Sequence, residues 1–512
     1  MGNLDLEMPG PPNRRQLDVV KKALNDGQVD IKDIDQRALA VLKLLKRTGK
    51  LTDRKNTPKE QAISRPEHEA LIREAGAEGI VLLKNSPAVL PLNPENSRKI
   101  ALLGPLANTK YRPQSSGKHY MSFSGLGPSR LFIHGQLVSH QVKETKDSMG
   151  FLLGVQEEHR FQHDFLCTES YDITIESIPS QVNNSELFLL QDQISVHLGL
   201  VHQAEMETDL LAESIALAKD ADIAICIVGN TAQWETEGQD MASMTLPADG
   251  SQDRLVAEVV KANPNTIVVI ATGVPVEIPW LDEVPAVIQA WYGGQETGNA
   301  ILDVLLGHVN PSGKLPVSWP KKYEHTACYG NFGLDSYDSG EVEYVEGVNV
   351  GYRHFDRLYG TQKEVLFPFG FGLSYSTFEV GKAELMGSFS QADENAEVTV
   401  TVTVKNTSSR AGAETVQVYL APPKGNADVG RPPQSLVAFE KVLLQPGQEQ
   451  QLRLTFKRDA AAFWVDEPAE RRGQVWRVEG GRHEVSISTS SSPKDVRARC
   501  VLDIGEAFEF QA

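Results

Sequence analysis

The chain has 512 residues, of which 40% are apolar and 23% charged, and its formal net charge is -18. This length corresponds to roughly two to four domains, each large enough to bury a core of its own. The negative charge argues against a nucleic-acid partner and an anionic membrane surface, because both would repel the chain.

Neither a membrane segment nor a metal or disulfide framework is predicted. The chain has no run of about 18 apolar residues, which a transmembrane helix needs, and Met1–Glu7 lacks the apolar core of an export signal. Sequons at Asn183 and Asn406 would matter only in a secreted protein. Cys226 lies in an apolar run and is expected to be a buried thiol. The four cysteines show no metal-ligand or redox spacing: Cys167, Cys226, Cys328 and Cys500.

The first elements predicted in chain order are a short strand at Leu4–Pro9 and two amphipathic helices. Apolar residues recur at helical spacing over Leu17–Leu24 and again over Ile34–Leu45. Asp33 is predicted to be the N-cap of the second helix. The polar stretch Thr52–Glu60 is expected to be a linker.

Apolar strands then alternate with helices, which indicates a parallel sheet covered on both faces. Thr297 is predicted to cap the last of these helices. The expected elements are helix Glu67–Gly79, strands Ile80–Lys84 and Lys99–Leu103, helix Leu210–Lys219, strand Ala221–Gly229, helix Gln252–Asn263, strands Thr266–Thr272 and Ala286–Trp291, and helix Glu296–Leu306.

Two further regions show the period-two alternation of half-buried strands. Within residues 119–200, Arg130–His134 and Tyr171–Glu176 indicate an all-β insertion. After an irregular segment at 321–375, a second set of strands predicts a small β-sandwich: Glu397–Lys405, Glu414–Leu420, Gln450–Phe456 and Gly481–Ser488.

The segment Trp234–Asp240 carries the strongest chemical signal. It follows closely on a predicted buried strand, and ligands of open α/β sheets bind at the carboxyl ends of the strands. An aromatic ring can stack on a pyranose, and a carboxylic acid can protonate a glycosidic oxygen. The segment therefore indicates a sugar site, although an acidic surface loop with a chance tryptophan would have the same composition.

Several segments, taken in order and spacing, resemble glycoside hydrolase family 3 β-glucosidases of fungal type. These segments are Ile80–Leu92, Trp234–Asp240, Trp291–Asn299, Asn310–Pro316 and Phe367–Tyr375. Leu4–Gly10 is similar to the end of the family's N-terminal barrel. Phe123–Gly125 and Arg130–Val138 resemble a protective-antigen-type sugar-binding β-sandwich that is shortened at its start.

The resemblance implies a multidomain α/β plus β protein. A barrel remnant and linker are expected at 1–58, and an αβα sandwich with a parallel sheet at 59–118 and 201–325. The shortened protective-antigen-type insertion is expected at 119–200, a connecting segment at 326–389, and a fibronectin type III-like β-sandwich at 390–505.

The family's retaining mechanism uses two carboxyl groups about 5–5.5 Å apart, one as nucleophile and one as acid/base. The resemblance assigns the acid/base to Glu237, with Glu235 as the second choice. It assigns substrate contacts to Trp234, Glu235 and Asp240. No metal and no cofactor are expected.

Two features of the chain differ from the family pattern. Gln239 stands where the family has an aromatic residue, and Met241 stands where it has an arginine. The family's nucleophilic aspartate lies on the barrel before the segment matched by Leu4–Gly10, and Asp5 is not that residue by motif. The nucleophile is therefore expected to be absent from these 512 residues.

The activity that the resemblance implies is hydrolysis of terminal non-reducing β-D-glucosyl residues, as in the breakdown of cellulose through cello-oligosaccharides. A xylosidase or an N-acetylglucosaminidase of the same family is an alternative. A non-catalytic carbohydrate-binding fragment and an incomplete gene model are two further alternatives. The expected partner is a β-glucoside or oligosaccharide, and a homo-oligomer is left open. Relatives are often secreted, although Met1–Glu7 predicts no signal peptide.

Overall fold

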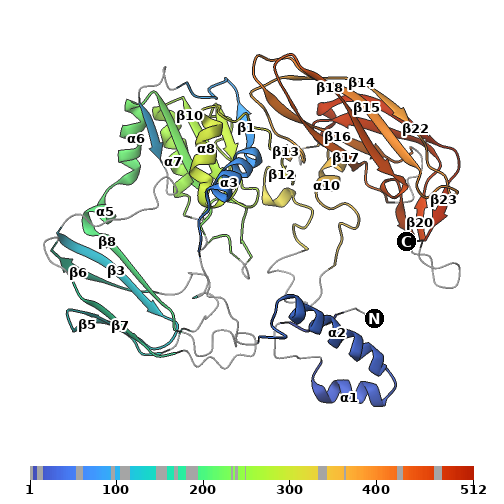
Figure 1. The fold of residues 1–512 in the computed structure, drawn as a ribbon. Coiled ribbons are helices and arrows are strands. Elements are labelled where there is room, and N and C mark those ends of the chain that lie inside the picture. The colour runs from blue at the N-terminus through green and yellow to red at the C-terminus, as the bar shows by residue number, and fades with distance from the viewer. Residues whose placement is uncertain are drawn as a thin grey trace. The chain divides into compact units, whose positions relative to one another are not determined.

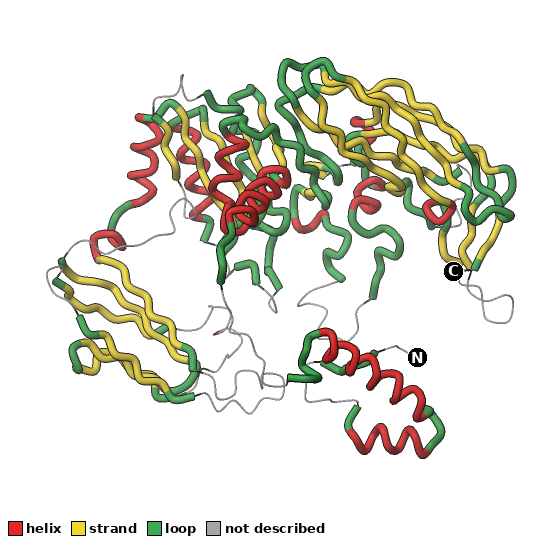
Figure 2. Tube along the Cα trace, viewed as in Figure 1, coloured by secondary structure: helices red, strands yellow, loops and turns green. Residues whose placement is uncertain are grey.

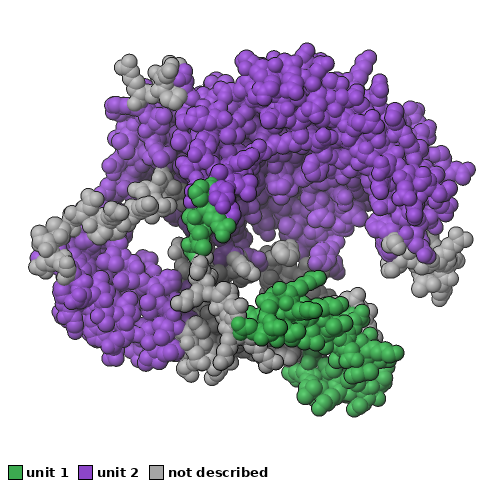
Figure 3. Space-filling model, in the orientation of Figure 1, with its two compact units in different colours: residues 1–66 green, residues 67–512 purple. Residues whose placement is uncertain are grey.

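The structure is a computed structural model, and the chain divides into two compact units at residues 1–66 and 67–512 (Figure 3). No described helix combines the length and the apolarity that crossing a bilayer requires. The described residues are 4–8, 15–53, 62–93, 99–103, 116–143, 145, 151, 158–166, 171–179, 194–231, 234–236, 240–247, 249–331, 343–361, 365–423, 430–465 and 475–511.

The first unit contains the helices α1 (Leu17–Asn25) and α2 (Ile31–Arg47). The prediction that Asp33 caps the second helix is wrong. Asp30 is the N-cap, and its side chain accepts a hydrogen bond from the Lys32 amide. Asp33 lies one turn further on and accepts from the Asp30 amide at 3.2 Å, which completes a capping box.

The strand predicted at Leu4–Pro9 does not form in the part of it that is described, residues 4–8, which contains only bends and irregular backbone. Asp5 forms an ion pair with Arg37 of α2 at 2.9 Å. No residue of α1 or α2 is buried, and apolar side chains such as Leu17 are exposed. A strand is stable only when a neighbouring strand completes its hydrogen bonds, and no strand is described in this unit.

The second unit contains a five-stranded sheet with the order β1-β11-β10-β9-β2 (Figure 1). The strands β2, β9, β10 and β11 are parallel, whereas the edge strand β1 runs antiparallel to β11. The sheet is therefore mixed, with a parallel centre. The strands are β1 (Val81–Asn85), β2 (Ile100–Leu103), β9 (Ile223–Gly229), β10 (Thr266–Ala271) and β11 (Ala286–Gln289).

Helices cover both faces of this sheet, as Figure 2 shows. The helices α6 (Leu210–Asp220) and α7 (Ser251–Ala262) contribute to one apolar core, and α3 (Pro66–Gly79) and α8 (Thr297–Leu305) contribute to the other. The predicted α/β fold class is confirmed. Cys226 is fully buried in the first core, and burial raises its pKa to about 12.

The start of α8 differs from the prediction. Thr297 does not cap the helix but is its first residue, and Glu296 precedes it. A short 3-10 turn at Gly294–Glu296 leads into the helix, and the Thr297 hydroxyl donates to the Gly294 carbonyl at 2.7 Å. The turn begins at Gly294 in the left-handed region, and the N-cap of α8 is one residue earlier than the sequence pattern suggested.

The region between β2 and α6 contains two antiparallel three-stranded sheets, with the orders β6-β3-β8 and β5-β4-β7. Met121, Phe123, Leu131 and Ile133 form a core between them. The short helix α5 (Gln203–Glu207) leads back towards α6. The strands are β3 (Gly117–Gly125), β4 (Ser129–Ile133), β5 (Gln136–Gln141), β6 (His159–Phe165), β7 (Ile173–Ser177) and β8 (Val196–His202).

The C-terminal part is the predicted β-sandwich. One sheet has the order β14-β15-β18 and the other β17-β16-β21-β22, and a small sheet β19-β20-β23 accompanies them. Every second residue of β15 is buried, as the valine–threonine alternation predicted. The strands are β14 (Phe378–Met386), β15 (Glu397–Asn406), β16 (Gly412–Ala421), β17 (Ser435–Leu444), β18 (Glu449–Lys457), β19 (Phe463–Val465), β20 (Val475–Val478), β21 (Gly481–Ser488), β22 (Val496–Ile504) and β23 (Phe508–Phe510).

Asn310 joins the α/β part to the sandwich. Its amide nitrogen donates to the Ser376 hydroxyl at 2.7 Å and to the Ala411 carbonyl at 2.9 Å. Its oxygen accepts from the Ser374 hydroxyl and from the Tyr375 amide. All four hydrogen bonds of one side chain are used, which explains why asparagine opens the Asn310–Pro316 motif.

Asp356 gives a pH-dependent contribution to stability. It lies on α10 (Tyr352–Arg357), and burial raises its pKa to about 6 although Gln434 and Ser491 donate to it. Because this pKa lies above the unfolded value of 3.8, the stabilising contribution is present at pH 4 and is lost as the pH rises through 6.

The variant Asp356→Asn should therefore be more stable than the wild type at pH 7, by about 1–3 kcal/mol. At pH 4 the two should be nearly equal, because the wild-type carboxyl is then protonated as well. Chemical denaturation at both pH values checks this expectation. An equal difference at pH 4 and pH 7 would contradict it.

Candidate functional site

The candidate site lies at the carboxyl edge of the sheet, where three parallel neighbours end. The strand β9 ends at Gly229, β10 at Ala271 and β11 at Gln289. Each strand is followed by a loop with polar or aromatic side chains. This edge is where open α/β sheets bind ligands, and the segment Trp234–Asp240 was expected here.

Glu235 is the centre of a hydrogen-bond cluster at this edge. Its Oε2 accepts from the Asn230 side chain at 2.9 Å and from the Tyr292 hydroxyl at 2.9 Å. The Gly273 amide donates to both carboxylate oxygens, at 3.1 and 3.2 Å. The three donors come from the loops after β9, β10 and β11, so one carboxylate connects all three strand ends.

The other predicted site residues occupy the same loop. Trp234 is half-buried, and its indole nitrogen donates to the Thr245 carbonyl at 3.3 Å. Asp240 is exposed. Glu237, the predicted acid/base, lies outside the described residues, as does Gln239. The assignment of Glu237, and of sugar contacts to Trp234, Glu235 and Asp240, therefore stays a prediction.

Sequence reasoning missed Asn230 and Gly273, and it gave no site role to Tyr292 although this residue lies in the motif segment Trp291–Asn299. The pKa of Tyr292 lies above its ordinary value because of partial burial and its hydrogen bond to Glu235. The Asn230 side-chain oxygen is buried without a hydrogen-bond partner among the described residues, and the Gln289 side-chain oxygen is too. Asn230, Gly273 and Tyr292 each stand one to three positions after a buried strand, and this was the available signal.

An apolar hollow of about 420 Å³ is lined in part by residues that directly follow Trp234–Asp240 in the chain. Met241 and Met244 line it from this loop, Val274 from the loop after β10, and Tyr323 from the segment after the sheet. Glu346 is an acidic group in its wall and accepts from the Asn331 side chain. The hollow places apolar surface beside the predicted sugar-binding loop.

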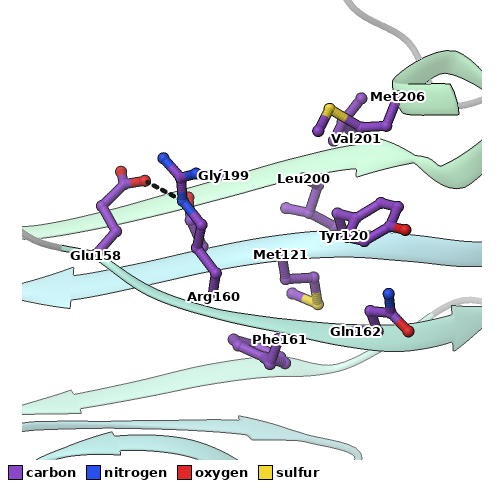
Figure 4. A pocket seen from close by; sticks show the side chains of 11 residues that line it. Tyr120, Met121, Glu158, Arg160, Phe161, Gln162, Gly199, Leu200, Val201 and Met206 are labelled. Carbon is purple, nitrogen blue, oxygen red and sulfur yellow. Dashed lines mark ion pairs between the residues drawn. The ribbon is translucent and has the colours of Figure 1, made fainter. Parts of the chain in front are cut away.

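A second hollow, of about 890 Å³, lies on the sheet β6-β3-β8 (Figure 4). Arg160, Ser122 and Gly199 stand side by side across the three strands. Because Gly199 has no side chain and that of Ser122 is small, the surface is lowered at this row. Tyr120 lines the next row, and Glu158 forms an ion pair with Arg160 at 3.9 Å.

Comparison with known proteins identifies the family. The glycosyl hydrolase family 3 C-terminal domain matches residues 80–375, and the fibronectin type III-like domain matches residues 414–491. Beta-glucosidase B of Emericella nidulans is 38% identical over 601 aligned residues, which cover 95% of this chain and 69% of that relative. The chain belongs to glycoside hydrolase family 3.

Other members of family 3 match over nearly the whole chain. Probable beta-glucosidase I of Aspergillus oryzae is 29% identical over 95% of the chain and 69% of its own length. The crystal structure of beta-glucosidase from Kluyveromyces marxianus superposes with a TM-score of 0.82 at 27% identity, covering 99% of this chain and 71% of that one. A second structure of that enzyme, in complex with glucose, gives a TM-score of 0.81.

Family membership confirms the resemblance seen in the sequence and makes the protein a glycoside hydrolase by family. The 601 positions aligned with Beta-glucosidase B exceed the 512 residues of this chain. That relative therefore contains internal segments that have no counterpart here.

Proposed function

We propose that this family 3 protein acts on β-D-glucosides by the retaining mechanism with Glu237 as its acid/base, paired with a nucleophilic carboxylate that no motif of these 512 residues identifies. The substrate is the terminal non-reducing β-D-glucosyl residue of a cello-oligosaccharide or an aryl glucoside. The observation that supports this most directly is the position of the acidic loop at the carboxyl edge of the parallel sheet. Relatives named as beta-glucosidases and a structural neighbour in complex with glucose support the sugar.

Glu237 suits the acid/base role better than Glu235. The Glu235 carboxylate already accepts hydrogen bonds from Asn230, Gly273 and Tyr292. To protonate a glycosidic oxygen it would have to give up these donors and take a proton. Glu237, two residues further on, follows the anchored start of the loop. The same carboxyl group must also act as a base in the second step, when water attacks the glycosyl-enzyme. This requires a carboxyl group that reaches the substrate.

The test is release of 4-nitrophenol from its β-D-glucoside by the 512-residue protein, with Glu237→Gln beside it. Turnover that Glu237→Gln lowers by about 10²–10⁴-fold supports the proposal and places a nucleophile within the chain. Glucose binding without turnover supports the sugar site with the nucleophile outside the chain. Turnover that Glu237→Gln leaves unchanged contradicts the proposal, and so does the absence of both glucose binding and turnover.

A second candidate function, carbohydrate binding without catalysis, is favoured by the hollow on the sheet β6-β3-β8. Tyr120 offers a ring face there, and Arg160 and Gln162 offer donors. Calorimetry with cellobiose should show binding that Tyr120→Ala removes and Glu237→Gln leaves intact. Phe439→Ala, which removes an exposed aromatic ring from β17 of the C-terminal sandwich, is the control. Equal binding by wild type and Tyr120→Ala would contradict this function.

A further inference from the structure

The Glu235 carboxylate accepts hydrogen bonds from donors at the carboxyl edge of the sheet. Oε2 accepts from Asn230 and Tyr292, both at 2.9 Å, and Oε1 accepts from the Gly273 amide at 3.1 Å. The Gly273 amide lies 38 residues further along the chain than Glu235, and the Tyr292 hydroxyl lies 57 residues further. The carboxylate therefore connects segments that are distant in sequence.

The donors themselves are held in place by the fold. Asn230 is 4% exposed, and its backbone amide donates to the Ala271 carbonyl of β10 at 3.1 Å. Gly273 follows β10 directly after Thr272, whose hydroxyl donates to the Val274 carbonyl. The positions of Asn230 and Gly273 are thus set by the sheet, whereas the third donor, Tyr292, is an exposed side chain.

The backbone at Gly273 leaves room for the carboxylate and for little else. A Cβ atom at this position would lie 2.2 Å from Glu235 Oε1. Gly273 has an ordinary negative φ, so the absence of a side chain serves close approach and not an unusual backbone. An alanine here would displace the end of the Glu235 side chain without removing its charge.

We propose that Glu235 is a positioning residue, whose carboxylate fastens the described start of the acidic loop, Trp234–Thr236, to the three strand ends and thereby supports the acid/base role proposed for Glu237. Glu235 then has no contact with the sugar. This inference rests on the proposed function, because it takes Glu237 as the acid/base. It changes the predicted role of Glu235 from substrate contact to support of the loop.

Two variants test the proposal from opposite sides. Glu235→Gln removes the charge and weakens the hydrogen bonds, whereas Gly273→Ala keeps every charge and pushes the carboxylate away. Glu283→Gln, which removes an exposed carboxylate before β11, at the opposite edge of the sheet, is the control. Thermal unfolding shows whether each variant keeps the fold, and the milder Tyr292→Phe removes a single donor if one does not.

The first readout is amide exchange in the acidic loop, which should become about tenfold faster in Glu235→Gln and Gly273→Ala and stay unchanged in Glu283→Gln. The second is the titration of Glu237, followed by ¹³C NMR of glutamate labelled at the side-chain carboxyl carbon, with the signal assigned through Glu237→Gln. A shift of about half a pKa unit in Gly273→Ala, which changes no charge, would report a changed position of Glu237.

The outcomes separate this proposal from the proposed function. Wild-type exchange and Glu237 titration in Gly273→Ala would overturn the positioning role while leaving Glu237 as acid/base. Loss of glucose binding in Glu235→Gln, with normal binding in Gly273→Ala, would make Glu235 a sugar ligand and also overturn it. Failure of the proposed function shows instead in Glu237→Gln, whose turnover and glucose binding do not depend on these two variants.

Discussion

Replacing Gly229 with valine is expected to destabilise the α/β part of the protein by about 4 kcal/mol or more and to displace the hydrogen-bond cluster of the candidate site. Gly229 ends β9, and a Cβ atom there would lie 2.0 Å from the Ala271 carbonyl oxygen and 2.8 Å from its carbon. Both are backbone atoms of the neighbouring strand β10. They can move aside only if the hydrogen bonds between the two strands break.

The consequences of this change reach the candidate site. The Gln252 side chain donates to the Gly229 carbonyl at 2.9 Å and accepts from the Gly229 amide at 2.8 Å. The next residue, Asn230, holds Glu235. A displaced end of β9 would therefore move Asn230, which donates to Glu235 in the acidic loop. It would also disturb the contact with Gln252 of α7.

A comparison of alanine with valine at Gly229 distinguishes a clash of the Cβ atom with the β10 backbone from overpacking by a large side chain. Alanine brings the same Cβ atom, so Gly229→Ala should cost nearly as much as Gly229→Val. Gly250 is the matched control, because it has φ +66° and nothing within 4 Å of a Cβ atom. Gly250→Ala should cost only about 1 kcal/mol from backbone strain. Amide exchange of β9 and β10 measures the loss of stability in both variants. If Gly229→Ala loses less stability than the control Gly250→Ala, the expectation is contradicted.

The α/β fold could be predicted because its signal is local in the sequence. Runs such as Ile223–Gly229 and Thr266–Ala271 are apolar on both faces, and only a covered parallel sheet buries both. The valine–threonine alternation of β15 similarly indicates one buried face. The direction of β1 was not predictable in this way, because a short edge strand has the same pattern whether it pairs parallel or antiparallel.

The site was predictable in position but not in its connections. Trp234–Asp240 was expected at the carboxyl edge because it follows a buried strand. The sequence could not show that the Glu235 carboxylate turns towards Gly273 and Tyr292, because these partners come from two later strands. The predictions of the two N-cap residues were wrong for a related reason. At Asp33 and Thr297 the preferred residue type was present, but a neighbouring residue took the role.

Removing the carboxylate of Glu479 is expected to destabilise the C-terminal β-sandwich by about 3–5 kcal/mol. Arg431 Nη1 donates to Glu479 Oε2 at 2.8 Å, and the two side chains are only 15% and 5% exposed. The guanidinium also lies 4.6 Å from the ring centre of Phe463 and donates to the Ala461 carbonyl at 3.3 Å. These neutral neighbours cannot replace a carboxylate, so Glu479→Ala leaves a buried positive charge without its counter-charge.

The cost of the unpaired charge can be separated from the net value of the pair. If the loss comes from burying Arg431 alone, then the double variant Arg431→Met with Glu479→Leu should regain most of the stability, to within about 1–2 kcal/mol of the wild type. Urea denaturation of the wild type, both single variants and the double variant gives the full cycle. If the double variant is as unstable as Glu479→Ala, the pair stabilises the sandwich through its own attraction. The buried ion pair would then be a source of stability in this domain and not a group tolerated only because both partners are present.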